Sequence, residues 1–160
     1  DEPVEDATAP SGGGAVFDIV VWCDHRATAE AEVVNATGHR LLANVGGAVS
    51  PEMEMPKLLW LKRHRPRTYA AARHFFDLAD YLTDRAADGP RGGAGLRSAC
   101  TVVCKWNFDA VAWAWDTTFL EAVGLLDLGE ARIGSPSEVR DVATAVPGGL
   151  GHRAAAELGL

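Results

Sequence analysis

The chain has 160 residues, of which 48% are hydrophobic, and its 15 Lys and Arg side chains against 22 Asp and Glu side chains give a net charge of −7. A chain of this size forms one domain, or a piece of a larger one, and buries roughly two-thirds of its unfolded surface. The negative balance argues against nucleic acid as a partner, because a phosphate backbone needs a positive field. No apolar run approaches the roughly 20 residues of a membrane span, and the start of the chain lacks the basic and apolar regions of a secretory signal.

Three cysteines form an odd set without a dense disulfide pattern, which favours a reducing, cytoplasmic setting. Cys100 and Cys104 are four positions apart, but no His or second Cys pair lies at zinc spacing. We therefore expect small buried side chains at these positions and no metal. The sequence starts without Met and stops within AAAELGL, a stretch typical of a helix, so we expect an internal segment of a longer protein.

The first half of the chain predicts one strand followed by helices. Residues 1–14 are acidic and then rich in Ser and Gly, which indicates a loop or a disordered end. Residues 15–22, AVFDIVVW, are β-branched and aromatic and predict a strand. Residues 24–39 then predict a helix that ends near Gly38, and after a turn-rich stretch a proline opens a helix over 56–64.

The second half predicts short helices and one more strand. Pro66 breaks the preceding helix and starts the next, and Asp77 is placed to cap a third. The stretch SACTVVCKW, residues 98–106, carries β-branched residues between small ones and predicts a strand. Strands separated by helices indicate an α/β or α+β class. The predicted helices of this half span residues 66–76, 78–87, 115–124 and 152–160.

Four polar or aromatic side chains, Trp22, Asp24, His25 and Arg26, crowd the end of the predicted first strand. In α/β folds ligands bind at the carboxyl ends of strands. A sugar would suit this set, because an indole covers the C–H face while charged groups hydrogen-bond the hydroxyls. The alternative is that Asp24 caps the following helix, Arg26 is solvated and Trp22 belongs to the core. The residues alone leave both interpretations open.

Two further charged residues are candidates for ligand contact. Glu52, on a proline-stiffened turn before a helix, either faces a ligand or complements the helix dipole. Lys105 is either the first solvated residue after an apolar strand or a ligand-facing ammonium beside Trp106. The basic cluster within 62–67 indicates a solvated helix junction. The chain contains no GxxxxGK[ST] or GxGxxG motif and no convincing Ser–His–Asp pattern.

Five blocks, in order, carry a resemblance: VVWCDHRATAEAEVVNATGH, VGGAVSPEMEMPKLLWLKRH, HFFDLADYLTDRA, RSACTVVCKWNF and AAAELGL. Together they resemble the FGGY carbohydrate kinases, and within that family the D-ribulokinase-like pentulose kinases. The resemblance implies an α/β fold, an incomplete part of an actin-like (ribonuclease-H-like) ATPase domain. Residues 15–160 would then be a partial N-terminal, sugar-binding domain.

The resemblance also implies site residues. Trp22, Asp24 and Arg26 match the family's W-x-D-x-R block, Glu52 falls where related kinases contact substrate, and Lys105 matches a lysine that contacts the ketose. No catalytic or metal-binding residue is implied within the chain. The D-x-G phosphate loop with which family members begin is absent from its start, and the aspartate base is expected beyond residue 160. ATP and Mg²⁺ would be bound mainly by other parts of the protein, and the segment alone would be inactive.

The implied activity is ATP-dependent phosphorylation of a pentulose, with D-ribulose as the first candidate. Ribitol, L-ribulose or xylulose are alternatives, and a non-catalytic sugar-binding relic is an alternative from another class. The implied partner is a small-molecule sugar, without nucleic acid or membrane, and a homodimer of the full-length protein stays open. Asp84, where an aromatic residue is usual, and the Gly-rich stretch near 89–96 depart from the family pattern.

Overall fold

Two compact units make up the chain. Unit 1 comprises Asp1–Arg73 and Thr117–Leu126, and unit 2 comprises His74–Asp116 and Asp127–Leu160. The computed structural model describes residues 19–87 and 95–160. The predicted loop or disordered end over 1–14 lies outside the described residues, as does most of the Gly-rich stretch near 89–96.

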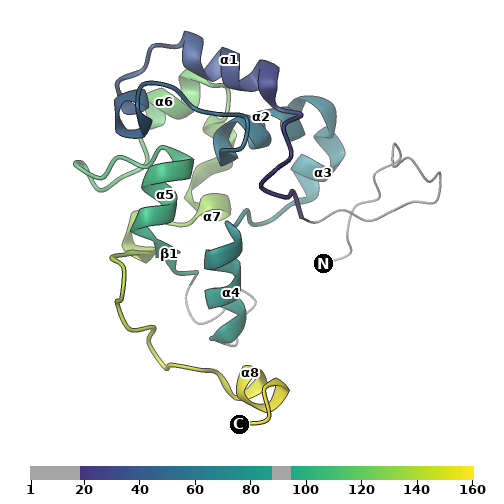
Figure 1. Ribbon diagram of the computed structural model, residues 1–160, viewed down its shortest axis with the longest axis vertical. Helices are drawn as coiled ribbons and strands as arrows, with labels where there is room; N and C mark the ends of the chain where they lie inside the picture. The colour runs from purple at the N-terminus through teal and green to yellow at the C-terminus, as the bar shows by residue number, and fades with distance from the viewer. Residues whose placement is uncertain (1–18, 88–94) are drawn as a thin grey trace, which may run out of the picture. The chain divides into compact units, whose positions relative to one another are not determined.

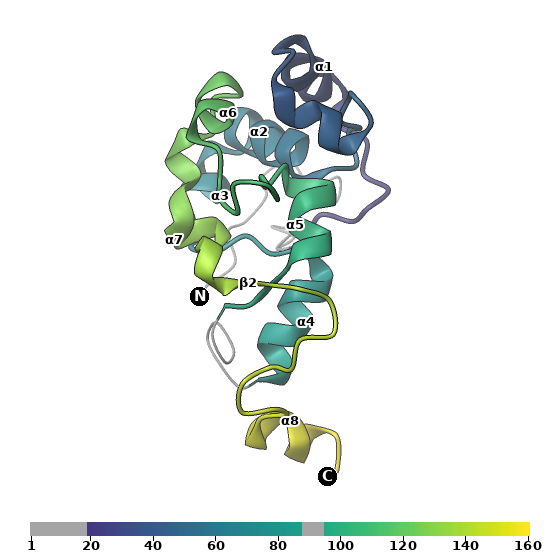
Figure 2. The same ribbon diagram turned by 90° about the vertical axis from the view of Figure 1, so that its left-hand side faces the viewer.

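Every regular element among the described residues of unit 1 is a helix, and turns and coil join these helices (Figure 1). Helix α1 packs on α2, as both views show (Figures 1 and 2). The contact follows from the sequence, because Ala31 and Val34 of α1 and Leu58 and Leu59 of α2 are buried at helical spacing. The elements of unit 1 are α1 (Thr28–Ala36), η1 (Arg40–Val45), α2 (Glu54–His64), α3 (Pro66–Ala71) and α6 (Thr117–Ala122).

The end of α1 lies where the sequence predicts it. Gly38 has a φ of 58°, a left-handed conformation that glycine adopts at little cost, and its N–H donates to the Asn35 carbonyl at 3.1 Å. The Asn35 side chain then bonds both backbone groups of Val49, at 2.7 Å to the N–H and 3.0 Å to the carbonyl. This amide therefore ties α1 to the turn-rich segment that leads into α2.

The predicted strand over 15–22 is wrong in its described part. Residues 19–22 pair with no strand among the residues that the structure describes, and the Trp22 side chain is exposed. An apolar run forms a strand only where a neighbour accepts and donates its backbone hydrogen bonds. Here the chain turns instead, with the Asp24 N–H donating to the Val21 carbonyl at 3.1 Å. Helix α1 consequently begins at Thr28, later than predicted.

Unit 2 combines short helices with a two-stranded parallel sheet. Arg97 pairs with Val139 and Ser98 with Arg140. At the far end of the chain, α8 lies beside the end of α4 (Figures 1 and 2), where the Gly151 N–H donates to the Ala86 carbonyl at 2.8 Å. The elements are α4 (Leu78–Ala86), β1 (Arg97–Ser98), α5 (Ala99–Trp106), α7 (Gly129–Ile133), η3 (Pro136–Glu138), β2 (Val139–Arg140) and α8 (His152–Glu157), with η2 (Leu126–Leu128) beginning at the last residue of unit 1.

The predicted strand over 98–106 is a helix except at its first residue. Val102 and Trp106, one turn apart, are both buried, so the apolar pattern has helical and not alternating periodicity. The helix ends at Asn107, which has a φ of 53°, a conformation that Asn tolerates better than most residues. The same helical geometry corrects the expectation for the cysteines, because Cys100 and Cys104 lie away from the buried face and are exposed.

Local signals predict where α3 and α4 begin, although the helix predicted over 66–76 ends at Ala71 and α7 was not predicted. Asp77 is the N-cap of α4, and its Oδ1 accepts a hydrogen bond from the Ala79 N–H at 3.0 Å. Pro66 is the first residue of α3, where its missing N–H costs nothing. The predicted helices over 115–124 and 152–160 are present as α6 and α8, each shorter than predicted.

Candidate functional site

The Asp24 and Arg26 side chains form a hydrogen-bonded ion pair in unit 1. The Arg26 Nη2 lies 2.6 Å from the Asp24 Oδ2, and Nε donates to both carboxylate oxygens at 2.9 and 3.0 Å. These hydrogen bonds lower the pKa of Asp24 below its ordinary value. The Arg26 guanidinium also stacks 4.3 Å from the ring centroid of Trp60. Asp24 does not cap α1, whose N-cap is Ala27, so neither a capping Asp24 nor an unattached Arg26 describes this pair.

Glu52 contacts the segment 22–26 through His25, the residue after Asp24. The His25 Nε2 lies 2.7 Å from the Glu52 Oε1, and both side chains are partly exposed. The Lys57 Nζ donates to the Val21 carbonyl at 2.9 Å and to the Trp22 carbonyl at 3.2 Å. These bonds hold the backbone on which Trp22 stands, while the indole itself is 75% exposed and not part of the core.

The structure therefore brings four predicted residues together on unit 1: Trp22, Asp24, Arg26 and Glu52. Sequence reasoning did not assign Lys57 and Trp60, which support them. One signal could have found both: they are three positions apart on α2, so they share a face of the helix that follows Glu52. The result is an exposed indole on the segment that also carries the Asp24–Arg26 ion pair, and His25 of this segment contacts Glu52. These residue types suit a polyhydroxylated ligand.

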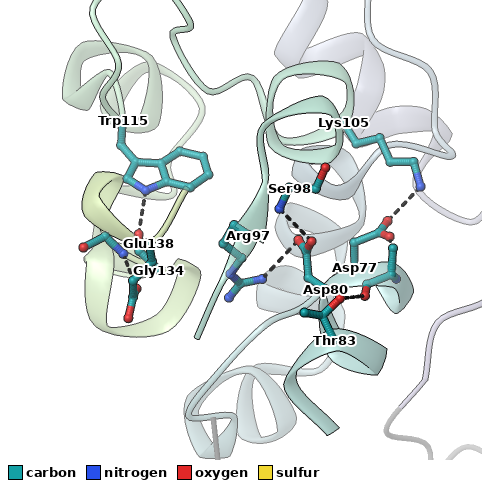
Figure 3. Close-up of polar contacts among 11 residues, drawn as sticks. Asp77, Asp80, Thr83, Arg97, Ser98, Lys105, Trp115, Gly134 and Glu138 are labelled. Atoms are coloured by element: carbon teal, nitrogen blue, oxygen red, sulfur yellow. Dashed lines mark hydrogen bonds and ion pairs between the residues drawn. The ribbon is translucent and has the colours of Figure 1, made fainter. Parts of the chain in front are cut away.

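Lys105 belongs to unit 2, in the last turn of α5. Its Nζ donates to the Asp77 Oδ2 at 2.7 Å, and its side chain is 47% exposed whereas that of Asp77 is 10% exposed. Its sequence neighbour Trp106 is buried. Lys105 is thus an ammonium at the surface of unit 2, held by a carboxylate from α4 (Figure 3).

A buried polar cluster lies one turn further along α4. Asp80 accepts a hydrogen bond from the Ser98 N–H at 2.9 Å, and its Oδ2 lies 3.9 Å from the Arg97 Nη1 (Figure 3). Asp80 and Arg97 are almost completely buried, and the Arg97 guanidinium stacks 4.0 Å from the ring centroid of Phe76. Burial raises the pKa of Asp80 to about 6, against the opposing effects of the Ser98 N–H and of Arg97. No sequence signal marked this cluster.

Metal binding finds no support in residues 19–87 and 95–160, where no three His, Cys, Asp or Glu side chains group as ligands. Although Cys104 is exposed, partial desolvation of its thiol raises its pKa, with Cys100 adding to the effect, which makes this thiol less reactive. Over the same described residues, no helix combines the length and the apolarity needed to cross a bilayer.

One protein-family model matches most of this chain. The model of the N-terminal domain of the FGGY family of carbohydrate kinases matches residues 13–128. The chain belongs to the FGGY family of carbohydrate kinases. The partial N-terminal domain of an FGGY kinase accounts for the mixed, incomplete α/β architecture, and the resemblance of the five sequence blocks is confirmed.

FGGY relatives match nearly the whole chain. It is 48% identical over 147 residues to an FGGY carbohydrate kinase domain-containing protein of Danio rerio, and 39% identical over 152 residues to one of Homo sapiens. These matches cover 89% and 92% of this chain and 26% of each relative. A D-ribulokinase of Saccharomyces cerevisiae is 38% identical over 154 residues, covering 89% of this chain and 21% of the relative.

A solved structure shows that the fold is that of an FGGY sugar kinase. A xyloylose kinase from Brucella ovis superposes with a TM-score of 0.66 at 25% identity, covering 88% of this chain and 26% of that chain. The chain thus spans about a quarter of the length of the curated relatives from fish and human, and of this solved kinase.

Proposed function

We propose that the full-length protein is an ATP-dependent kinase that converts D-ribulose to D-ribulose 5-phosphate, and that this chain supplies part of its sugar site. The observation that carries the proposal is the similarity to the yeast D-ribulokinase, which extends along most of the chain. Residues 15–160 would form part of the N-terminal domain. The protein would work in the cytoplasm on a small-molecule sugar, and a homodimer of the full-length protein is compatible with this role.

The side chains of this segment suit sugar binding better than phosphate chemistry. Phosphoryl transfer depends mostly on positioning and electrostatic stabilisation, and the described residues hold neither a metal cluster nor a glycine-rich phosphate loop. In the proposal, Trp22 covers an apolar face of the pentulose. On unit 1, Glu52 hydrogen-bonds its hydroxyl or keto oxygens, and the ion pair of Asp24 and Arg26 shapes the neighbouring polar surface. Lys105, on unit 2, is assigned a contact with the ketose through its match to the family's lysine.

The test measures ADP release by the full-length protein on a panel of D-ribulose, L-ribulose, xylulose and ribitol. Lys105→Ala removes one charged hydrogen bond, which lowers kcat/KM for the preferred sugar by roughly 10- to 150-fold. Lys62→Ala is the matched control, because the Lys62 ammonium bonds the Gly124 carbonyl at 2.7 Å and has no role in the proposed site. Unchanged kcat/KM for every sugar in Lys105→Ala would contradict the assignment of Lys105.

The Brucella ovis xyloylose kinase supports a second candidate, a kinase of a xylulose-type ketose. Specificity between epimeric pentuloses depends on the placement of single hydroxyl partners, so the panel decides by the ratio of kcat/KM values. Preference for xylulose over D-ribulose would replace the first candidate with the second. Sugar binding without ADP release from any member of the panel would instead favour the non-catalytic relic.

A further inference from the structure

The Asp77 carboxylate serves two elements at once. Its Oδ1 accepts the Ala79 N–H at 3.0 Å and so caps α4, while its Oδ2 accepts the Lys105 ammonium at 2.7 Å. Figure 3 shows Lys105 extending from α5 toward Asp77. A capping aspartate needs only one oxygen, and α4 would be capped equally well by Ser or Asn. Helix capping therefore accounts for the bond from the Ala79 N–H but not for the bond from Lys105, which needs a separate explanation.

The same face of α4 also holds the beginning of α5. Asp80 follows Asp77 by three positions, so the two carboxylates lie on one side of the helix. Asp80 accepts the Ser98 N–H at 2.9 Å, directly before α5, and Asp77 accepts Lys105 in the last turn of α5. Two carboxylates of α4 thus hold the two ends of α5, so the backbone that carries Lys105 is anchored as well as its ammonium (Figure 3).

Such anchoring has a direct consequence for ligand binding. A lysine side chain has four rotatable bonds and loses much of its rotamer entropy when it is ordered. Asp77 is nearly buried, whereas half of the Lys105 side chain is exposed, so the carboxylate is the fixed partner and the ammonium the one that is held. An ammonium has three N–H donors, so the bond to Asp77 orients it and by itself occupies one of the three.

We propose that Asp77 is a positioning residue for Lys105: it orders the ammonium before the sugar arrives, so that less side-chain entropy is lost on binding. This inference rests on the proposed function, in which Lys105 contacts the pentulose. Asp77 itself acts only through Lys105 and does not touch the substrate.

A double-mutant cycle in the full-length protein tests the inference, with kcat/KM for D-ribulose as the readout. Asp77→Ser retains a cap of similar quality for α4, but its shorter side chain cannot reach Lys105. We expect it to lower kcat/KM about three- to tenfold in the parent and to have no further effect in Lys105→Ala. The KM for D-ribulose should rise while the KM for ATP stays unchanged, a split that a general loss of structure would not produce.

The outcomes separate the inference from the proposed function. An equal loss from Asp77→Ser in both backgrounds, or no loss in the parent while Lys105→Ala is impaired, overturns the positioning role and leaves the proposed function standing. An unimpaired Lys105→Ala overturns the positioning role together with the assignment of Lys105 to the sugar site, while ADP release on the sugar panel still decides the proposed activity. Should Asp77→Ser fail to fold, Asp77→Asn takes its place in the cycle, since it retains the cap and the volume while removing the charge, and we expect the same pattern with a smaller loss.

Discussion

Asp80→Asn is expected to change how the stability of unit 2 depends on pH. Asp80 is 2% exposed, and burial raises its pKa from 3.8 to about 6. Because the pKa in the folded state lies above that of the unfolded chain, the folded state holds the proton more tightly between these values. The contribution of Asp80 to stability is therefore favourable at low pH and is lost as the pH rises through this window.

The size of the effect follows from the shift. A difference of about two pKa units corresponds to about 3 kcal/mol over the whole titration, of which about 2 kcal/mol falls between pH 4 and pH 6. Asn has nearly the same shape and keeps an oxygen for the Ser98 N–H, but it cannot ionise. The variant therefore lacks this loss, and its stability relative to the parent improves by that amount as the pH rises.

Hydrogen exchange of the peptide that covers β1 and α5 measures this difference in the full-length protein. Parent and variant are compared at each pH, so the intrinsic pH dependence of exchange cancels. Asp141→Asn, which removes a negative charge from an exposed position of the same unit, is the control for net charge. The reasoning would be refuted if the difference in stability between Asp80→Asn and the parent stayed constant from pH 4 to pH 6, or if the parent gained stability relative to the variant over that range.

Three further expectations follow from single contacts. Trp115→Phe removes the indole donor that bonds the Gly134 carbonyl at 2.7 Å, and should lower the free energy of unfolding by about 1–3 kcal/mol in denaturant titrations. Glu30→Gln neutralises a buried carboxylate that pairs with Arg63 and lies 3.4 Å from the His64 Nε2, both half-exposed at the end of α2, so a loss near 1 kcal/mol and faster hydrogen exchange in α1 are expected. Glu52→Gln should reduce kcat/KM for the pentulose about tenfold without changing the KM for ATP, and an unaltered kcat/KM would remove Glu52 from the proposed site.

Local signals predicted several boundaries well. Asp77 before α4, Pro66 at the start of α3 and Gly38 after α1 each satisfy or remove backbone hydrogen bonds within a few residues, so their effect depends little on distant structure. The failures were the two apolar stretches. Residues 19–22 and 98–106 are rich in β-branched residues, and that preference is weak enough for tertiary contacts to override it.

The candidate site divides in the same way. Residue types and motif order pointed to Trp22, Asp24, Arg26, Glu52 and Lys105. Their partners could not be predicted, because those contacts join segments far apart in the chain. In the sequence alone, nothing distinguishes Lys57 or Trp60 from any other residue of a helix, because their role depends on the residues that they contact.

The amino-acid sequence was thus sufficient to place this chain in the FGGY family, because the motifs and their order along the chain can be recognised without knowing any tertiary contact. It was also sufficient to locate helix ends governed by short-range capping. Only the tertiary structure decided that SACTVVCKW is a helix, since the burial of Val102 and Trp106 on one face outweighs β-propensity. Only tertiary structure, likewise, gives Asp80 its raised pKa and Asp77 its hold on Lys105, because burial and ion pairing depend on which distant segments the fold brings together.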